Sequence, residues 1–60
     1  MPYRTNADLP SNQVARYAPH QKNAFREAFN AALKYGHTEA SAFAIAHTAA
    51  QRTPRKKKVS

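Results

Sequence analysis

Cysteine and tryptophan are absent from this 60-residue chain, glycine occurs once, and only three residues are acidic. Without cysteine, no disulfide can brace a small domain and no thiol can take part in redox chemistry. A single glycine excludes a glycine-rich phosphate loop, and three scattered acids offer no carboxylate pair for acid and base catalysis. We therefore expect a protein that is not an enzyme and that has no cofactor.

Long apolar runs are also missing. No segment approaches the roughly 18 residues that a membrane-spanning helix requires, and the polar residues 1–6 do not resemble a signal peptide. The absence of tryptophan and of a strongly apolar helix face argues against insertion into a membrane. We expect the chain to stay where it is made, in the cytoplasm or nucleoid of a bacterial host, or in the nucleus of a eukaryotic one.

Positive charge, by contrast, is abundant and unevenly distributed. Ten lysine and arginine residues against three acids give a net charge of +7 and an isoelectric point of about 10.4. Residues 1–51 contain five of the bases and all three acids, whereas residues 52–60 contain the other five bases. So dense a run of like charge, with one apolar side chain, cannot bury enough surface to offset its ordering entropy. We therefore predict a helical domain over 1–51 and a disordered basic tail over 52–60.

The first part of the domain is expected to be short and interrupted by proline. Asp8 as an N-cap, Pro10 in the first turn and Pro19 as a stop predict a first helix over about 10–17. The preceding segment, Met1–Asn6, leans toward extended backbone and could form a short strand if it finds a partner.

Two longer helices are predicted after it. From Pro19 to Tyr35 no proline or glycine interrupts apolar residues at three- and four-residue spacing, and Gly36 is a natural left-handed stop. Thr38 is a suitable N-cap for a third helix that extends to about Gln51. The expected fold is mainly α: a small three-helix domain dominated by a hairpin of the second and third helices.

The core of this domain must be built from few large side chains, because 13 of the apolar residues are alanine. Alanine on the inner face of the third helix lets the two backbones approach closely, so that phenylalanine from the second helix can fill the space. The expected core residues are Leu9, Val14, Tyr17, Phe25, Phe29, Leu33, Tyr35, Phe43 and Ile45.

Several short motifs over about residues 1–51 recur together in one known family. They are Met1-Pro2-Tyr3, Asp8-Leu9-Pro10, His20, Glu27-Ala28-Phe29-Asn30, Glu39-Ala40, Phe43-Ala44-Ile45-Ala46 and Ala49. In order and spacing they resemble the ChaB family, which is labelled as cation transport regulators and has ChaB-like members in bacterial and insect viruses. The resemblance implies a compact, mainly helical domain without recognised catalytic residues and, for the viral members, a role in nucleic-acid binding.

The chain departs from the family pattern at two places. His47 stands where the family typically has a tryptophan, and Arg52-Thr53-Pro54 with a lysine run replaces a segment of lysine and tyrosine. The first change is compatible with the fold if the site is partly exposed. The second puts any strand after the last helix in doubt.

The basic tail is the strongest candidate for a binding site. Lysine and arginine that sit on phosphates release condensed counterions, and log K on duplex DNA then falls by roughly 0.9 per phosphate neutralised. A solubility tail, a remnant of the end of a reading frame and, in a eukaryotic or insect-virus setting, a nuclear import signal are the alternatives. The candidate phosphate-binding residues of the tail are Arg52, Arg55, Lys56, Lys57 and Lys58.

A second candidate site is a polar stripe on the second helix. Lys22, Arg26, Asn30 and Lys34 recur every four residues, which predicts one face turned away from the phenylalanines. Such a face could follow a phosphate backbone, with Asn30 within reach of a sugar, a phosphate or a base edge. The alternative is an ordinary solvated helix face.

Two pairs, Tyr3 with Arg4 and Arg16 with Tyr17, could offer stacking and charge to unpaired bases, although tyrosines are more often structural in a core this poor in bulk.

The three histidines are spaced too far apart along the chain to pair on one helix face, so no metal site is predicted. We expect His20 to cap or pack at the start of the second helix and His37 to lie in the turn. His47 is expected to be a partly exposed aromatic filler or, failing that, a pH-sensitive contact.

These observations favour a small nucleic-acid-binding protein, viral or phage accessory or regulatory in character, that makes largely sequence-nonspecific phosphate contacts. DNA is favoured over RNA, and the chain is expected to be a monomer or a weak homodimer. The alternative is a regulatory adaptor for an acidic partner, a host protein or a cation transporter, which would need an exposed apolar patch around Tyr17, Tyr35 and His47. A weaker third alternative is attachment of the tail to an anionic membrane surface.

Overall fold

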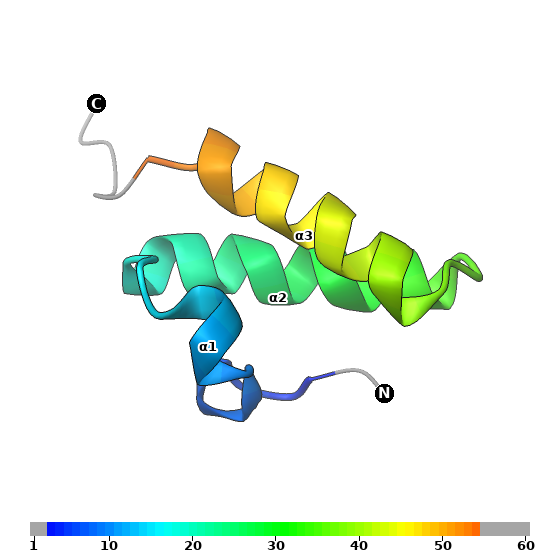
Figure 1. Cartoon of the computed structure of the whole chain (residues 1–60), viewed down its shortest axis with the longest axis horizontal. Helices are drawn as coiled ribbons and strands as arrows, with labels where there is room; N and C mark the ends of the chain where they lie inside the picture. The colour runs from blue at the N-terminus through cyan, green and yellow to red at the C-terminus, as the bar shows by residue number, and fades with distance from the viewer. Residues whose placement is uncertain (1–2, 55–60) are drawn as a thin grey trace.

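The computed structural model describes residues 3–54 of the chain, and Figure 1 shows their arrangement. A 3-10 helix, η1, spans Asn6–Asp8, and three α-helices follow it: α1 over Ser11–Val14, α2 over Pro19–Lys34 and α3 over Glu39–Arg52. The predicted mainly α fold with three helices is confirmed. None of the described helices is both long enough and apolar enough to span a membrane.

The turn between α2 and α3 is closed by Gly36, whose φ of 95° lies in the left-handed region. The backbone N–H of His37 donates to the carbonyl of Ala32 and that of Gly36 donates to the carbonyl of Leu33, each at 3.0 Å. This pair of hydrogen bonds defines a Schellman cap, which satisfies carbonyls that the end of a helix leaves without a partner. The predicted end of the second helix at Gly36 is confirmed.

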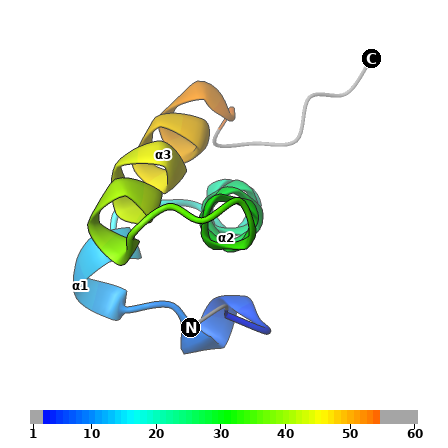
Figure 2. The same cartoon turned by 90° about the vertical axis from the view of Figure 1, so that its right-hand side faces the viewer.

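α3 begins as predicted at Thr38. The Thr38 Oγ1 accepts a hydrogen bond from the Ser41 backbone N–H at 3.2 Å, as an N-cap residue does, and Glu39 lies in the first turn, where the helix dipole favours an acid. α3 then returns alongside α2, so the two helices form the predicted hairpin (Figure 1 and Figure 2).

Gln21 joins the open end of this hairpin, where the start of α2 lies beside the end of α3. Its Nε2 donates to the carbonyls of Ala50 and Thr53, both at 3.2 Å, and its Oε1 accepts from the Ala18 backbone N–H at 3.0 Å. The residue is only 7% exposed, so these bonds offset the cost of burying its amide. Apolar periodicity does not predict a polar residue in this role.

The core between the two long helices confirms the expected use of alanine. Phe25 and Phe29 from α2 are fully buried, and so are Ala42, Ala46 and Ala50 along the facing side of α3. Burial of each phenylalanine contributes about 1.5–3 kcal/mol to stability. The hydrophobic core therefore consists of large side chains on one helix and small ones on the other.

Two of the nine predicted core residues were wrongly assigned. Tyr35 is 82% exposed because it follows the last residue of α2, and Ile45 is 38% exposed because it lies outside the buried face of α3 that Ala46 marks. The other predicted core residues are buried (Leu9, Val14, Phe25, Phe29) or partly buried against the core (Tyr17, Leu33, Phe43).

The predicted first helix over about 10–17 is also corrected, since α1 is a single turn. Asp8 does not cap it. Instead its carboxylate accepts from the Thr5 backbone N–H at 3.3 Å, while the Leu9 N–H donates to the Asn6 carbonyl at 3.2 Å and closes η1. Pro10 is the N-cap of α1 rather than part of its first turn.

The ends of the described chain differ from expectation as well. No strand occurs in residues 3–54, and Tyr3 directs its backbone polar groups to a side chain of α2 instead. At the other end, Arg52 is the last residue of α3 and Thr53 is its C-cap, so the helix extends one residue into the segment predicted as tail. The predicted disorder of residues 55–60 lies outside the described residues.

Candidate functional site

One flank of α2 holds the N-terminal segment, defined here as residues 3–9. The Asn30 side chain bonds both backbone groups of Tyr3: its Oδ1 accepts from the N–H at 2.8 Å and its Nδ2 donates to the carbonyl at 2.7 Å. Arg26 adds two bonds, from Nε to Asn6 Oδ1 at 3.0 Å and from a terminal nitrogen to the Arg4 carbonyl at 2.9 Å. These four bonds fix the segment along the helix.

The predicted outward stripe on the second helix is therefore corrected at its two central residues. Arg26 and Asn30 are half-buried and turned toward the N-terminal segment, not toward solvent. A four-residue repeat advances by about 40° around a helix at each step, so the stripe starts near the buried face and drifts to the outside only at Lys34. Contact of Arg26 and Asn30 with nucleic acid stays a prediction.

The tyrosines proposed as stacking platforms pack inside the domain. The Tyr3 ring lies against Phe29 with ring centroids 4.9 Å apart, and the Tyr17 ring lies 6.2 Å from that of Phe25. Both tyrosines are half-buried, while Arg4 and Arg16 beside them are exposed. The geometry favours the structural role for both tyrosine rings.

The remaining candidate cations lie at the two ends of the hairpin. Lys22, half-buried, is in the first turns of α2, and the exposed Arg52 ends α3, so both belong to the open end of the hairpin. Lys34 is exposed at the opposite end, next to the turn. The candidates Arg55, Lys56, Lys57 and Lys58 lie outside the described residues. Lys22 and Arg52 therefore belong to one end of the hairpin, and Lys34 belongs to the other.

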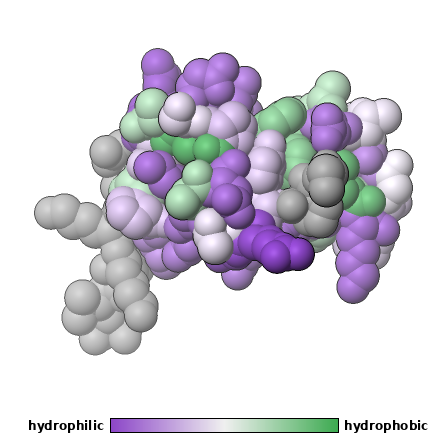
Figure 3. All heavy atoms as spheres, turned by 90° about the horizontal axis from the view of Figure 1, so that it is seen from below, coloured by the Kyte–Doolittle hydropathy of each residue, from purple (hydrophilic) through white to green (hydrophobic). Residues whose placement is uncertain are grey.

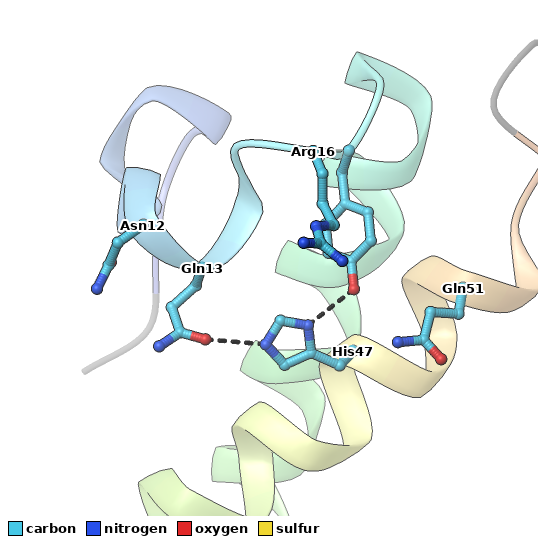
Figure 4. A pocket seen from close by; sticks show the side chains of 6 residues that line it. Asn12, Gln13, Arg16, His47 and Gln51 are labelled. Carbon is cyan, nitrogen blue, oxygen red and sulfur yellow. Dashed lines mark hydrogen bonds between the residues drawn. The ribbon is translucent and has the colours of Figure 1, made fainter.

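A polar hollow opens between α1 and α3, with a volume of about 460 Å³. Figure 4 shows it from close by, with α1 and the turn after it on one side and α3 on the other. Its lining contains one cation, no acid and three amides; the six lining residues are Asn12, Gln13, Arg16, Tyr17, His47 and Gln51.

His47 is the centre of this hollow. Its Nδ1 lies 2.8 Å from the Tyr17 hydroxyl and its Nε2 lies 2.9 Å from Gln13 Oε1. A neutral ring that holds its proton on Nε2 satisfies both bonds, because the phenol then donates to Nδ1 and the ring donates to the amide oxygen. The ring also meets Phe25 edge-on, with centroids 5.0 Å apart. His47 therefore ties α3 to α1 and to the turn that follows.

The three histidines lie in different surroundings. His47 is the half-buried aromatic filler that was expected, with the two hydrogen bonds as an addition that the sequence does not reveal. His37 lies in the turn, and His20 is exposed in the first turn of α2, so it does not pack in the core. Among residues 3–54 no three side chains of histidine, cysteine, aspartate or glutamate come together as a metal site would require.

The apolar patch that an adaptor would need is not assembled as predicted. Tyr17 and His47 bond to each other at the open end of the hairpin, whereas Tyr35 is exposed at its turn. Figure 3 shows, for the face seen from below, that apolar side chains reach the surface in separate places divided by polar ones.

Comparison with protein-family models, with curated proteins and with solved structures gives no match in any of the three.

Proposed function

We propose that this is a small nucleic-acid-binding protein whose affinity comes mainly from phosphate contacts of the basic tail. The observation that carries the proposal is the charge distribution: residues 52–58 hold five of the ten bases and no acid. Arg52 and Lys22 extend this positive charge onto the open end of the hairpin. A single anionic strand or duplex can therefore contact the tail and this end of the domain together.

The amides of α2 support a binding mode with little sequence preference. Readout of a base edge needs a side chain that is free to form paired hydrogen bonds in a groove. Asn30 uses its amide on Tyr3, and Asn23 Oδ1 accepts from Asn6 Nδ2 at 2.6 Å. With these two amides engaged within the domain, the cations that remain contact phosphates, which carry no sequence information directly.

The test is a salt titration of the full chain on a random-sequence duplex and a random single strand, with a variant that replaces Arg55, Lys56, Lys57 and Lys58 by alanine. If each cation neutralises one phosphate, the variant loses about 3–4 from the slope of log K against log salt on duplex DNA. Affinity should fall alike for all sequences. Equal slopes for the two proteins, or a loss confined to one sequence, would overturn the proposal.

A regulatory adaptor for an acidic protein is the second candidate, because one large apolar side chain, Tyr35, is 82% exposed at the turn of the hairpin. An aromatic side chain exposed among polar ones is a common anchor of protein interfaces. No nucleic-acid binding at moderate salt, together with a protein partner that the wild type retains and Tyr35→Ser loses, would favour this function instead.

A further inference from the structure

The hollow between α1 and α3 has the volume of a small-molecule site and a polar lining. Its volume of about 460 Å³ falls within the range of roughly 300–1,000 Å³ that such sites occupy. Gln13 and Arg16 line one side, and His47 and Gln51, one turn apart on α3, line the other. Side chains from two separate elements thus converge on one space.

The hydrogen bonds already formed show which groups face a ligand. His47 and Tyr17 are engaged with each other, and Gln13 Oε1 is engaged by the His47 ring, so these three side chains form a fixed wall. Gln51 is exposed, and Figure 4 shows its amide turned toward His47. No hydrogen bond holds this amide within residues 3–54. Gln51 therefore has a donor and an acceptor to offer, beside the positive charge of Arg16.

The charge of the hollow selects the class of ligand. Arg16 is the one formal charge in the lining, and a guanidinium binds phosphate through paired N–H groups. A bare phosphate would use this cation and leave the amides without a role. A nucleotide uses both, because its base edge presents the donors and acceptors that glutamine and asparagine amides match.

The position of the hollow adds a second argument. Gln51 lines it, and the next residue, Arg52, is the first cation of the basic run. Arg52 thus offers a phosphate contact directly after a residue that lines the hollow. Proteins that bind unpaired nucleic acid use this combination of a positive track for the backbone and side-chain contacts for splayed bases.

We propose that the hollow between α1 and α3 binds one unpaired nucleotide, with its phosphate on Arg16 and its base edge on the Gln51 amide and the Gln13 Nε2. The identity of the physiological ligand rests on the proposed nucleic-acid function, whereas binding of a nucleotide at the hollow does not. Because a base must leave its pair to enter, the site gives single strands an advantage over duplexes that the tail alone does not give.

The direct test is titration of the full chain with adenosine and cytidine 5′-monophosphate, followed by NMR of the backbone and side-chain amides. Inorganic phosphate and ribose 5-phosphate are the reference ligands. We expect saturable shifts at Gln13, His47 and Gln51 with the nucleotides, and binding at least about fivefold weaker for the two reference ligands. No saturable shift at these residues, or equal binding of phosphate and nucleotide, would overturn the proposal.

Arg16→Gln and Arg4→Gln form a matched pair, since both remove one exposed arginine charge and only the first residue lines the hollow. Arg16→Gln should weaken nucleotide binding about fivefold or more, and Arg4→Gln less than twofold. Equal weakening by the two would show a general charge effect and overturn the site. If Arg16→Gln alters the fold as judged by its amide spectrum, Gln51→Ala replaces it, with a loss of about threefold expected and no loss contradicting the proposal.

Salt titrations separate this proposal from the function of the tail. Arg16→Gln should lower affinity for a single strand while it changes the duplex slope by less than about 1, whereas the tail variant should lower the slope on both. If nucleotides bind at the hollow but the tail variant has no effect, the nucleotide site is supported and phosphate binding by the tail is rejected. If the tail variant has an effect but no nucleotide binds, phosphate binding by the tail is supported and the nucleotide site is rejected.

Discussion

The N-terminal segment and α3 both pack on α2, but different forces hold them. α3 contributes fully buried alanines that close over Phe25 and Phe29, so its attachment is apolar. Residues 3–9 have apolar contacts through buried Leu9 and the Tyr3 ring, and in addition four hydrogen bonds with Arg26 and Asn30. The same helix thus meets α3 with an apolar face and meets the N-terminal segment with a polar flank as well.

This difference shows why a polar stripe on a helix is a weak sign of a binding face. The residues expected to contact phosphate at the middle of α2 have backbone partners within the chain. Hydrogen bonds to groups 22 and 27 positions away are enough to turn an outward stripe into an internal contact. Two of the exposed candidate cations, Lys34 and Arg52, are the last residues of α2 and α3.

The largest effect on stability is expected from the loss of a buried aromatic ring in the hydrophobic core. Phe29→Ala removes a fully buried ring that also lies 4.7 Å from Phe43 and 4.9 Å from Tyr3, measured between ring centroids. Such a truncation costs about 3–5 kcal/mol, which a domain of this size cannot spare, so we expect loss of the helical signal in circular dichroism at 25 °C. Tyr35→Ala is the control and should stay within about 0.5 kcal/mol of the wild type. A cooperative transition near that of the wild type in Phe29→Ala would contradict this account of the core.

The second largest effect on stability is expected from the loss of the hydrogen bonds between α2 and the N-terminal segment. Asn30→Ala leaves both backbone groups of Tyr3 without their partner, at a cost of about 1–3 kcal/mol in urea unfolding. Amide exchange should rise in residues 3–9 and remain slow in α2 and α3, because the hairpin keeps its core. The control, Asn23→Ala, loses one exposed bond to Asn6 and should cost less than Asn30→Ala. Uniform acceleration of exchange across both helices would show that the segment and the hairpin are not separable.

A smaller effect on stability is expected from substitution of Gly36 in the turn between α2 and α3. Gly36→Ala forces a side chain onto a φ of about 95°, and a Cβ added there meets no atom within 4 Å, so backbone strain is the whole cost. We expect a loss of about 1–2 kcal/mol in thermal unfolding. Gly36→Asn should cost less, since asparagine tolerates the left-handed region. Equal stability of Gly36→Ala and the wild type would contradict the cap assigned to α2.

The smallest effect concerns the contact between α1 and α3. His47→Phe keeps an aromatic ring against Phe25 but removes the bonds to Tyr17 and Gln13, so about 0.5–1.5 kcal/mol should be lost. His20→Ala, at an exposed position, should change stability by less than about 0.5 kcal/mol. An unfolding free energy for His47→Phe at or above the wild-type value would show that the ring acts only by packing.

The sequence predicts the hairpin well because its signals are local. Gly36 and Thr38 mark the turn by their own conformational preferences, and the spacing of Phe25 and Phe29 marks the buried face. The sequence-based predictions fail mostly where residues far apart in the chain interact. The bonds of Asn30 to Tyr3 and of Gln21 to Ala50 join residues that are 27 and 29 positions apart, and no periodicity encodes them.

The candidate binding sites also differ in whether the sequence alone reveals them. Composition alone predicts an anionic partner, because the basic run of residues 52–58 is visible without a fold. The hollow is not visible, since it exists only once α1 and α3 bring Gln13 beside His47, 34 positions apart. Asp8 was misassigned for a related reason: a carboxylate near a proline suits either a cap or a tight turn, and the contact with Thr5 decides for the turn.

The proposed function assigns nucleic-acid binding to cations of the tail, whereas Arg26 holds the N-terminal segment. The most direct measurement is the salt dependence of duplex binding for the wild type, Arg26→Gln and the variant with alanine at positions 55–58. We expect a slope lower by about 3–4 in the tail variant and by less than about 0.5 in Arg26→Gln. A larger loss of slope in Arg26→Gln than in the tail variant would contradict it.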